Sequence, residues 1–242
     1  TTTDSFTFTL NDATTTLASA TFAITVNPVD DAPVLNTNAG VTVVEGMNVG
    51  ITTAELSSSD VDTADTDLIY TVTGGLANGQ IELSTAPGVA VTSFTQDDLS
   101  SGRVIYVHSG NETTSDSFTF TLKDATTTLA AATFNITVTP VDDAPVLVTN
   151  AGLTLDEATT ATITTGLLST TDVDTLDGGL IYTVTGVPVN GQLELSTAPG
   201  VAITSFTQAD LAANLVRYVH SGSETISDAF DFTVGDATTT LA

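Results

Sequence analysis

The feature that most constrains the fold is an internal repeat with a period of 112 residues. Asp4–Leu10 (DSFTFTL) returns at 116–122, and Val29–Leu35 (VDDAPVL) returns at 141–147. No gap is needed, and 92 of the 130 positions are identical when residues 1–130 are compared with 113–242. Two copies this similar arose by duplication, so we expect them to share one fold.

Two proline-flanked segments, Asn27–Pro33 and Thr139–Pro145, are predicted linkers, because proline ends the hydrogen-bonded ladder of a strand. The repeat then divides the chain into three parts. Residues 1–32 are expected to be the C-terminal strands and linker of a preceding repeat, 33–144 a complete repeat, and 145–242 a second repeat lacking its last strand.

The counterpart of the segment 133–138 would follow residue 242, while residues 21–26 have the matching pattern and no complete unit of their own. Two explanations stay open from the sequence. The chain is a window of a longer array, or the N-terminal strands of one copy complete the last unit of the next, because an open sheet edge is a template for pairing.

Composition excludes several classes of function. With 29 acidic residues against 3 basic ones, the formal net charge is −26. The chain therefore has too few cations to neutralise the phosphates of nucleic acid or to bind an anionic membrane surface. The absence of cysteine excludes disulfides, cysteine zinc sites and thiol catalysis. No apolar run approaches the ~20 residues of a membrane span. At 41% hydrophobic residues, with abundant Thr and Val, the chain is predicted to be an acidic all-β protein with a buried core.

Apolar and polar residues alternate within the complete repeat, which is typical of half-buried strands. Phe118, Phe120 and Leu122 are expected to face inward, with Tyr106 and Ile136 in the same core. Thr95–Asp98 (TQDD) predicts a short helical turn with a capping box, anchored by Leu99. Seven or eight short strands in about 110 residues fit a β-sandwich. The expected strands are approximately 40–45, 48–54, 68–74, 79–84, 89–94, 103–108, 116–122 and 132–138.

The order of these motifs resembles the cadherin-like repeat of chondroitin-sulfate-proteoglycan type, which also occurs in large bacterial surface and secreted proteins. The most specific part is FTQDDL at 94–99 followed by VIYVH at 104–108; DSFTFTLKD at 116–124 adds to it. The resemblance covers nearly the whole chain. It implies tandem immunoglobulin- or cadherin-like β-sandwich repeats strung end to end, serving adhesion or extracellular scaffolding. The nearly identical copies and the Thr- and Asp-rich composition favour a prokaryotic source.

Acidic clusters are the strongest chemical signal. Asp60 and Asp62 lie in a loop between predicted strands, Asp30 and Asp31 in a linker, and Asp124 in a turn that should share one sandwich end with the Asp60 loop. Hard oxygen ligands in a flexible loop suit Ca²⁺. The alternative is that the acidic loops are simply solvated. The counterparts in the second copy are Asp142, Asp143, Asp172, Asp174 and Asp236.

The resemblance adds further detail to this hypothesis. Cadherins place an Asp-x-Asp loop, an Asp-rich linker and a strand-edge Glu at their junctions. By that resemblance Asp142 and Asp143 would join Glu45, Asp172 and Asp174 at the second junction, with Glu112 or Asp116 contributing. The linker here reads VDDAP, without the two asparagines of the usual motif.

The remaining candidates favour structural roles. His108 and His220 are expected to be buried and hydrogen-bonded, since a zinc site would need partners that each repeat lacks. A triad of Ser109, His108 and Asp116 has no accompanying nucleophile-elbow motif, so we expect no enzyme. Arg103 and Arg217 are expected to pair with acids at the surface, and the four tyrosines to lie in the cores. Asn111 and Asn135 head glycosylation sequons.

The sequence therefore predicts a structural and adhesive segment of a long extracellular rod or stalk, stiffened by Ca²⁺, with neighbouring repeats of its own chain as partners. The alternative is a self-assembling extracellular filament, sheath or surface layer, in which copies contact each other laterally or by strand exchange. An enzyme or carbohydrate-binding module has no supporting constellation of residues.

Overall fold

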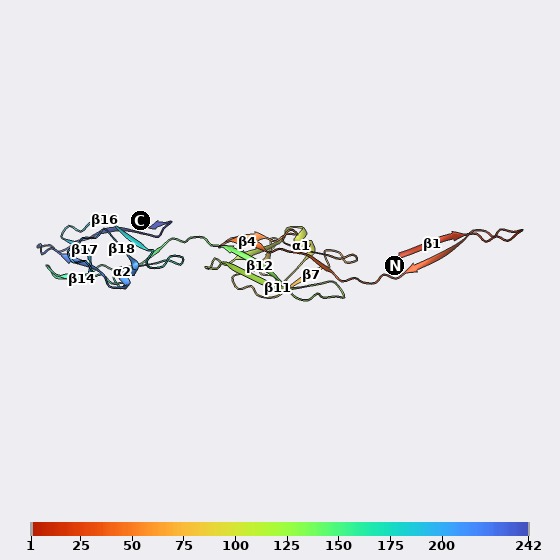
Figure 1. The fold of residues 1–242 in the computed structure, drawn as a ribbon, viewed down its shortest axis with the longest axis horizontal. Helices are drawn as coiled ribbons and strands as arrows, with labels where there is room; N and C mark the ends of the chain where they lie inside the picture. The colour runs from red at the N-terminus through yellow and green to blue at the C-terminus, as the bar shows by residue number, and fades with distance from the viewer. Residues whose placement is uncertain (1, 242) are drawn as a thin grey trace. The chain divides into compact units, whose positions relative to one another are not determined.

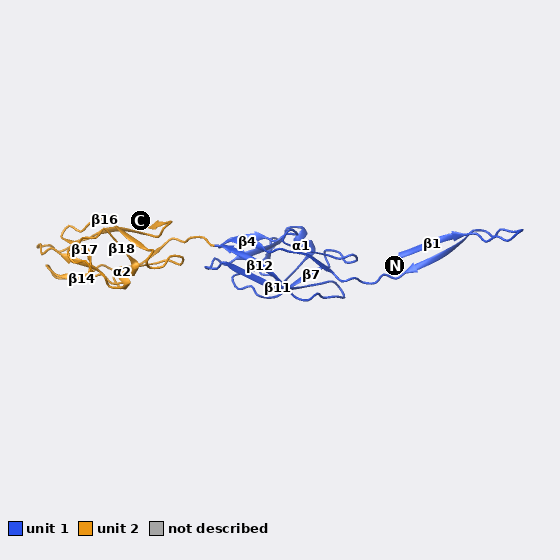
Figure 2. Cartoon of the chain, viewed as in Figure 1, with its two compact units in different colours: residues 1–139 blue, residues 140–242 orange. Residues whose placement is uncertain are grey.

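A computed structural model describes residues 2–241. They form two compact units that divide between residues 139 and 140: unit 1 before that point and unit 2 after it (Figures 1 and 2). Unit 1 begins with an antiparallel hairpin of β1 (Thr2–Phe8) and β2 (Ala20–Val26). Every residue of both strands is exposed, and neither strand pairs with any other strand among the described residues. The hairpin therefore lacks a core of its own.

The rest of unit 1 is a β-sandwich. A five-stranded sheet has the order β4-β12-β11-β7-β9, a three-stranded sheet has the order β5-β10-β8, and β3 pairs with β6. The two largest sheets enclose the core, which includes Tyr70, Tyr106, Phe118, Phe120 and Ile136. The bounds are β3 Val34–Asn38, β4 Val41–Val44, β5 Asn48–Gly50, β6 Leu56–Ser59, β7 Ile69–Gly74, β8 Gly79–Leu83, β9 Ser93–Thr95, α1 Gln96–Ser100, β10 Val104–His108, β11 Ser115–Lys123 and β12 Ala132–Thr139.

Unit 2 repeats most of this architecture. Its sheets have the orders β18-β16-β20-β21, β14-β19-β17 and β13-β15. The bounds are β13 Val146–Asn150, β14 Thr160–Thr162, β15 Leu168–Thr171, β16 Ile181–Gly186, β17 Gly191–Leu195, β18 Ser205–Thr207, α2 Gln208–Ala212, β19 Val216–His220, β20 Asp231–Gly235 and β21 Thr240–Leu241. The expectation that both copies share one fold is wrong in one respect, because residues 153–156, the counterpart of β4, form no strand.

The predicted inward face is confirmed. Phe118, Phe120 and Ile136 are at most 1% exposed, and Tyr106 is fully buried. The capping box is also confirmed, since Thr95 Oγ1 accepts the N–H of Asp98 at 3.1 Å and Asp98 Oδ2 accepts the N–H of Thr95 at 2.8 Å. These features were predictable because each depends on neighbours only a few residues apart.

Three strand predictions need correction. The strand predicted at 48–54 ends at Gly50, because the Glu55 carboxylate accepts the Thr52 N–H at 2.8 Å and turns the chain. The strand predicted at 89–94 is reduced to β9, because Glu82 holds the preceding segment in a turn by accepting the N–H of Gly88 at 2.7 Å. The pair β3 and β6 was not predicted, because the apolar–polar alternation is masked: Val34 is exposed, whereas Thr37 and Ser58 take inward positions.

The arginines pair with acids as predicted. Arg103 contacts Asp97 at 2.5 Å and Asp98 at 2.9 Å. Arg217 contacts Glu194 at 2.6 Å, and that carboxylate is buried rather than at the surface. No helix among the described residues is long and apolar enough to cross a membrane.

Candidate metal centre

The turn after β11 is built by Asp124. Its Oδ1 accepts the N–H groups of Thr126 at 2.7 Å and Thr127 at 2.5 Å, which closes the turn and fixes the carboxylate. Asp124 is only 5% exposed. The same DATTT sequence makes the same turn at Asp236, whose Oδ1 accepts the N–H groups of Thr238 and Thr239 at 2.6 Å each.

The loop after β6 uses the same local chemistry. Asp60 Oδ1 accepts the N–H groups of Asp62 at 2.9 Å and Thr63 at 3.0 Å. In unit 2, Asp172 Oδ1 accepts the N–H groups of Asp174 and Thr175 at 2.8 Å each. In each case one carboxylate oxygen shapes the loop, and the second oxygen is left for another partner.

The linker connects the loop to the turn in both units. Within unit 1 the hydroxyl of Thr126 donates to the Asp30 carboxylate, and the backbone N–H of Asp31 bonds Asp62. Within unit 2 the hydroxyl of Thr238 donates to Asp142, and the N–H of Asp143 donates to Asp174 Oδ2 at 2.7 Å. Carboxylate oxygens of Asp143 and Asp174 lie within 4.8 Å of one another. The structure therefore gathers five predicted residues in each unit: Asp30, Asp31, Asp60, Asp62 and Asp124, and Asp142, Asp143, Asp172, Asp174 and Asp236.

Three oxygens at these ends are buried without a hydrogen-bond partner among the described residues: Oδ2 of Asp60, Asp124 and Asp172. A buried carboxylate oxygen without a partner is costly, and such groups are rare in folded proteins. A hard cation is the partner that several converging carboxylates accept most readily. The donor set consists of oxygen alone, which fits Ca²⁺ and does not favour softer metals.

The electrostatics of the cluster point the same way. The backbone N–H of Asp62 holds the pKa of Asp60 below its ordinary value. The pKa of Asp62 is raised, first by its hydrogen bond with Asp60, then by desolvation and by the negative charges of Asp60 and Asp30. Near neutral pH these carboxylates repel one another, and a divalent cation would remove that repulsion.

Glu45 lies elsewhere in unit 1. It follows β4, is 8% exposed, and its N–H donates to the carbonyl of Thr139 at 3.0 Å. Because β12 runs antiparallel to β11, Thr139 and Asp124 are at opposite ends of the sandwich. Glu45 therefore stands at the end from which the second linker leaves, away from the cluster of unit 1.

Asp116 is committed to the fold. Its carboxylate accepts the Tyr106 hydroxyl at 2.8 Å and the backbone N–H groups of Ala77, Asn78 and Ser117 at 2.9–3.2 Å. Four donors saturate its oxygens, which leaves no lone pair suited to a metal.

Sequence reasoning did not identify this hydrogen-bonding role of Asp116, nor that of buried Gln96, whose Oε1 accepts from Ser58 and Tyr70. The spacing of these partners along the chain gives no local signal.

His108 is buried and structural, as predicted. Its Nδ1 accepts the N–H groups of Gly46 at 3.1 Å and Gly110 at 3.2 Å, and Nε2 lies 3.0 Å from the Thr113 hydroxyl. The hydroxyl of Ser109 donates to Asn111 at 2.7 Å rather than to the histidine. The hypothetical triad is therefore not assembled. His220 makes equivalent bonds but is only partly buried.

Comparison with known proteins identifies a consistent set of relatives. The cadherin-like family matches residues 33–138 and 145–241. Human extracellular matrix organizing protein FRAS1 is 39% identical over 225 residues, which is 92% of this chain and 6% of that protein. Extracellular matrix protein 3 of Lytechinus variegatus is 37% identical over 233 residues, 96% of this chain and 7% of that protein. Human chondroitin sulfate proteoglycan 4 is 33% identical over 211 residues, 82% of this chain and 9% of that protein.

The chain thus spans less than a tenth of the length of these curated relatives. The match to chondroitin sulfate proteoglycan 4 agrees with the repeat type that the sequence motifs indicated. All three relatives are animal proteins, which does not favour the expectation of a prokaryotic source.

Proposed function

The chain belongs to the cadherin-like family, and from this premise we propose that it is a non-enzymatic structural and adhesive segment of an extracellular protein whose sandwich ends bind Ca²⁺. The named relatives are extracellular matrix proteins and a proteoglycan, which supports the extracellular placement. Residues 1–32 would be the end of a preceding repeat, 33–144 a complete repeat and 145–242 a second repeat. Its partners would be neighbouring repeats.

The observation that carries the calcium proposal is the set of buried carboxylate oxygens without partners, Oδ2 of Asp60, Asp124 and Asp172. An acidic loop that is merely solvated leaves its outer oxygens in water, whereas these oxygens are shielded from it. The linker residues Asp30 and Asp142 bond threonines of the neighbouring turns. A cation held by loop, turn and linker together would fasten each linker to its own sandwich.

Binding of a cation to these carboxylates would also stiffen the linkers between sandwiches. Without a cation, repulsion among the carboxylates would loosen the linker, and the segment between sandwiches would act as a hinge. With Ca²⁺ the linker would be held, and a series of such units would form a rod. By family resemblance, Glu45 would contribute at the junction that follows unit 1.

The experiment is a thermal melt with chelator, with millimolar Ca²⁺, and with NaCl at matched ionic strength. We expect Ca²⁺ to raise Tm, because a ligand at a hundredfold excess over its Kd stabilises by about 2.7 kcal/mol. NaCl should substitute poorly, since it screens charge without coordinating. An unchanged Tm and an unchanged maximum dimension in small-angle scattering would refute the calcium proposal.

A substitution distinguishes coordination from general charge. Asp124→Asn keeps an oxygen for the turn but replaces the unpartnered Oδ2 by an amide group. We expect the variant to match or exceed the parent Tm of unit 1 in chelator and to lose the rise of that transition with Ca²⁺, while unit 2, whose own cluster is unchanged, keeps its response. Glu224→Gln removes the same charge at an exposed site and should behave as the parent in both conditions. Equal calcium responses in all three proteins would exclude Asp124 as a ligand.

A further inference from the structure

A glycosylation sequon, Asn135-Ile136-Thr137, lies in the middle of β12. This strand pairs with β11 on one side and with β4 on the other (Figure 1). Phe134, Ile136 and Val138 are buried, while the residues between them are exposed. Because side chains alternate along a strand, Asn135 and Thr137 both stand on the outer face of the five-stranded sheet. The acceptor amide and the hydroxyl of the sequon therefore both face the solvent.

The outer face of the sheet around Asn135 is neutral. The outward positions of β4, β11 and β12 hold serine, threonine and asparagine, apart from Val44 and Lys123. The formal net charge of the chain is −26, yet none of these outward positions holds a carboxylate. A surface of hydroxyl and amide groups can donate hydrogen bonds to a neutral oligosaccharide and accept them from it, without desolvating a charge.

The neighbours of Asn135 across the sheet are small. Ser117 of β11 faces it directly, and the parallel pairing of β12 with β4 places Gly40 on its other side. A Cβ at Gly40 would lie 2.6 Å from the Asn135 carbonyl oxygen and 3.7 Å from its Cβ, so a side chain there would crowd Asn135. A shallow hollow of about 270 Å³ is lined by Asn135, Gly40 and Glu55 among others, and Glu55 is already hydrogen-bonded to Thr52. This arrangement leaves room beside Asn135 for a bulky group.

The other sequon, Asn111–Thr113, has a different environment. Nδ2 of Asn111 donates to Asn78 Oδ1 at 2.8 Å, and its Oδ1 accepts the Ser109 hydroxyl at 2.7 Å. The carboxamide of Asn111 thus fastens a loop of the sandwich. The carboxamide of Asn135 makes no hydrogen bond to any residue that the structure describes. A substituent on Asn135 would therefore disturb no contact of the fold.

We propose that Asn135 carries an N-linked glycan, which lies over the row formed by Gly40, Asn135 and Ser117. The inference rests on the extracellular placement proposed above, because the donor is a lipid-diphosphate-linked oligosaccharide of the secretory pathway. Nδ2 of Asn135 forms a bond to the anomeric carbon of the first sugar, and the bond from that carbon to the diphosphate oxygen breaks. The lipid diphosphate leaves, and the amide gives up one proton.

The position of Asn135 in the sheet determines when the sugar is added. Both edges of β12 are hydrogen-bonded in the folded unit, to β11 and to β4. A transferase cannot draw this segment into its active site without breaking both ladders, so transfer precedes the pairing of β12. The glycan then remains on the outer face, where it adds a bulky, solubilising group without opening the core.

The test is to express the 242-residue chain behind a secretory leader in cultured animal cells and to measure its mass. We expect an excess mass that peptide N-glycosidase removes, with aspartate left at position 135 in the peptide spectrum. Asn135→Gln should lose this glycan, and so should Thr137→Ala, which keeps the asparagine but destroys the sequon. Both residues are exposed, so both variants should fold and melt as the enzymatically deglycosylated parent does. Asn111→Gln is the matched control and should keep the glycan at Asn135.

Several results would overturn the proposal. An unmodified Asn135 in protein recovered from the medium is one. A glycan at Asn135 that survives Thr137→Ala, or that disappears in Asn111→Gln, is another. The rise of Tm with Ca²⁺ should be the same in the parent and in Asn135→Gln, because Asn135 belongs to neither acidic cluster. A missing glycan would thus refute this inference and leave the calcium proposal to its own experiment.

Discussion

The hydroxyl of Tyr106 donates a hydrogen bond of 2.8 Å to Oδ2 of Asp116, and this bond joins the two largest sheets of unit 1. Tyr106 is in the middle of β10, and Asp116 is near the start of β11. The same carboxylate also binds the backbone of Ala77 and Asn78 before β8. One buried acid thus ties three segments together, and unit 2 repeats the bond between Tyr218 and Asp228 at 2.7 Å.

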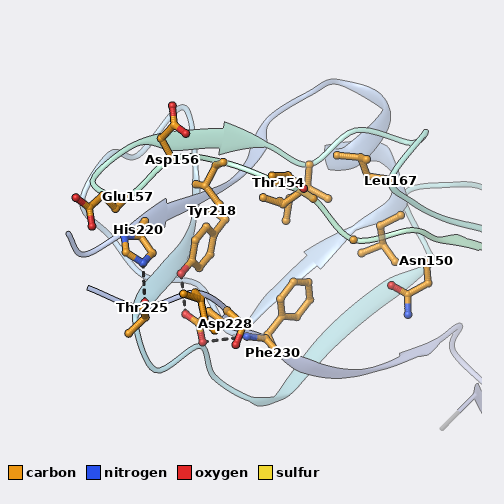
Figure 3. Close-up of a pocket in the computed structure, with 18 of the residues that line it drawn as sticks. Asn150, Thr154, Asp156, Glu157, Leu167, Tyr218, His220, Thr225, Asp228 and Phe230 are labelled. Carbon is orange, nitrogen blue, oxygen red and sulfur yellow. Dashed lines mark hydrogen bonds between the residues drawn. The ribbon is translucent and has the colours of Figure 1, made fainter. Parts of the chain in front are cut away.

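Tyr106→Phe is expected to destabilise the protein by about 1.5–3 kcal/mol, the range for a hydrogen bond to a charged group. Urea unfolding would measure the loss. Tyr218→Phe serves as the matched control, and we expect a smaller loss because Tyr218 is 7% exposed and lines a cavity, where water can replace the hydroxyl (Figure 3). Equal losses at both sites would contradict this interpretation.

Phe120→Ala is expected to cost about 3–5 kcal/mol as a large-to-small core substitution. Phe120 is 1% exposed and lies against Tyr70, with 5.6 Å between ring centroids. The matched change Phe232→Ala should cost less, because Phe232 lines a cavity and is only partly buried. A loss below about 1 kcal/mol for Phe120→Ala in denaturant unfolding would mean that the core is assigned to the wrong face.

Two glycines in the same sheet should respond differently to alanine. A Cβ at Gly79 would lie 2.4 Å from the carbonyl oxygen of Val107 and 2.5 Å from the Tyr106 hydroxyl, so Gly79→Ala should cost about 1–3 kcal/mol by overpacking. A Cβ at Gly50 would meet nothing within 4 Å, so Gly50→Ala should change stability by less than about 0.5 kcal/mol. Thermal melts of both variants give the comparison, and similar Tm shifts would refute the steric argument.

Acid should destabilise the chelated protein in a defined range. The backbone N–H groups of Thr239 and Thr238 lower the pKa of Asp236 from its ordinary 3.8 to about 2. Because the folded pKa is depressed, the stability from this carboxylate is fully present above about pH 4 and is lost as pH falls toward 2. Backbone hydrogen bonds likewise lower the pKa of Asp12, first from Thr14 and then from Thr15. Asp62 has the opposite effect on the pH dependence of stability. Because its folded pKa is raised, its contribution to stability is present at low pH and is lost as pH rises.

Thermal melts in chelator between pH 7 and pH 2 would follow this dependence. We expect a nearly constant Tm down to about pH 5 and a steep decline below about pH 4. Asp236→Asn should retain the turn and show a shallower decline. A Tm that rises between pH 4 and pH 2 would show that repulsion among the carboxylates outweighs their hydrogen bonds.

The local features of this fold were predictable from the sequence. Strand alternation placed Phe118 and Phe120 inward, and the spacing of Thr95 and Asp98 predicted the capped helix. The acidic loop and linker were expected to meet at one sandwich end, and the structure brings Asp62 to Asp31 there. Such features depend on hydrogen bonds and side-chain periods that span only a few residues, or on the order of strands.

The tertiary structure alone decided which segments become strands and which carboxylates are shielded. The segments Val34–Asn38 and Leu56–Ser59 show no clear alternation of apolar and polar residues, yet they pair with each other as β3 and β6. A strand holds its conformation through hydrogen bonds to another strand, so local sequence could not reveal this pairing or the burial of Asp124.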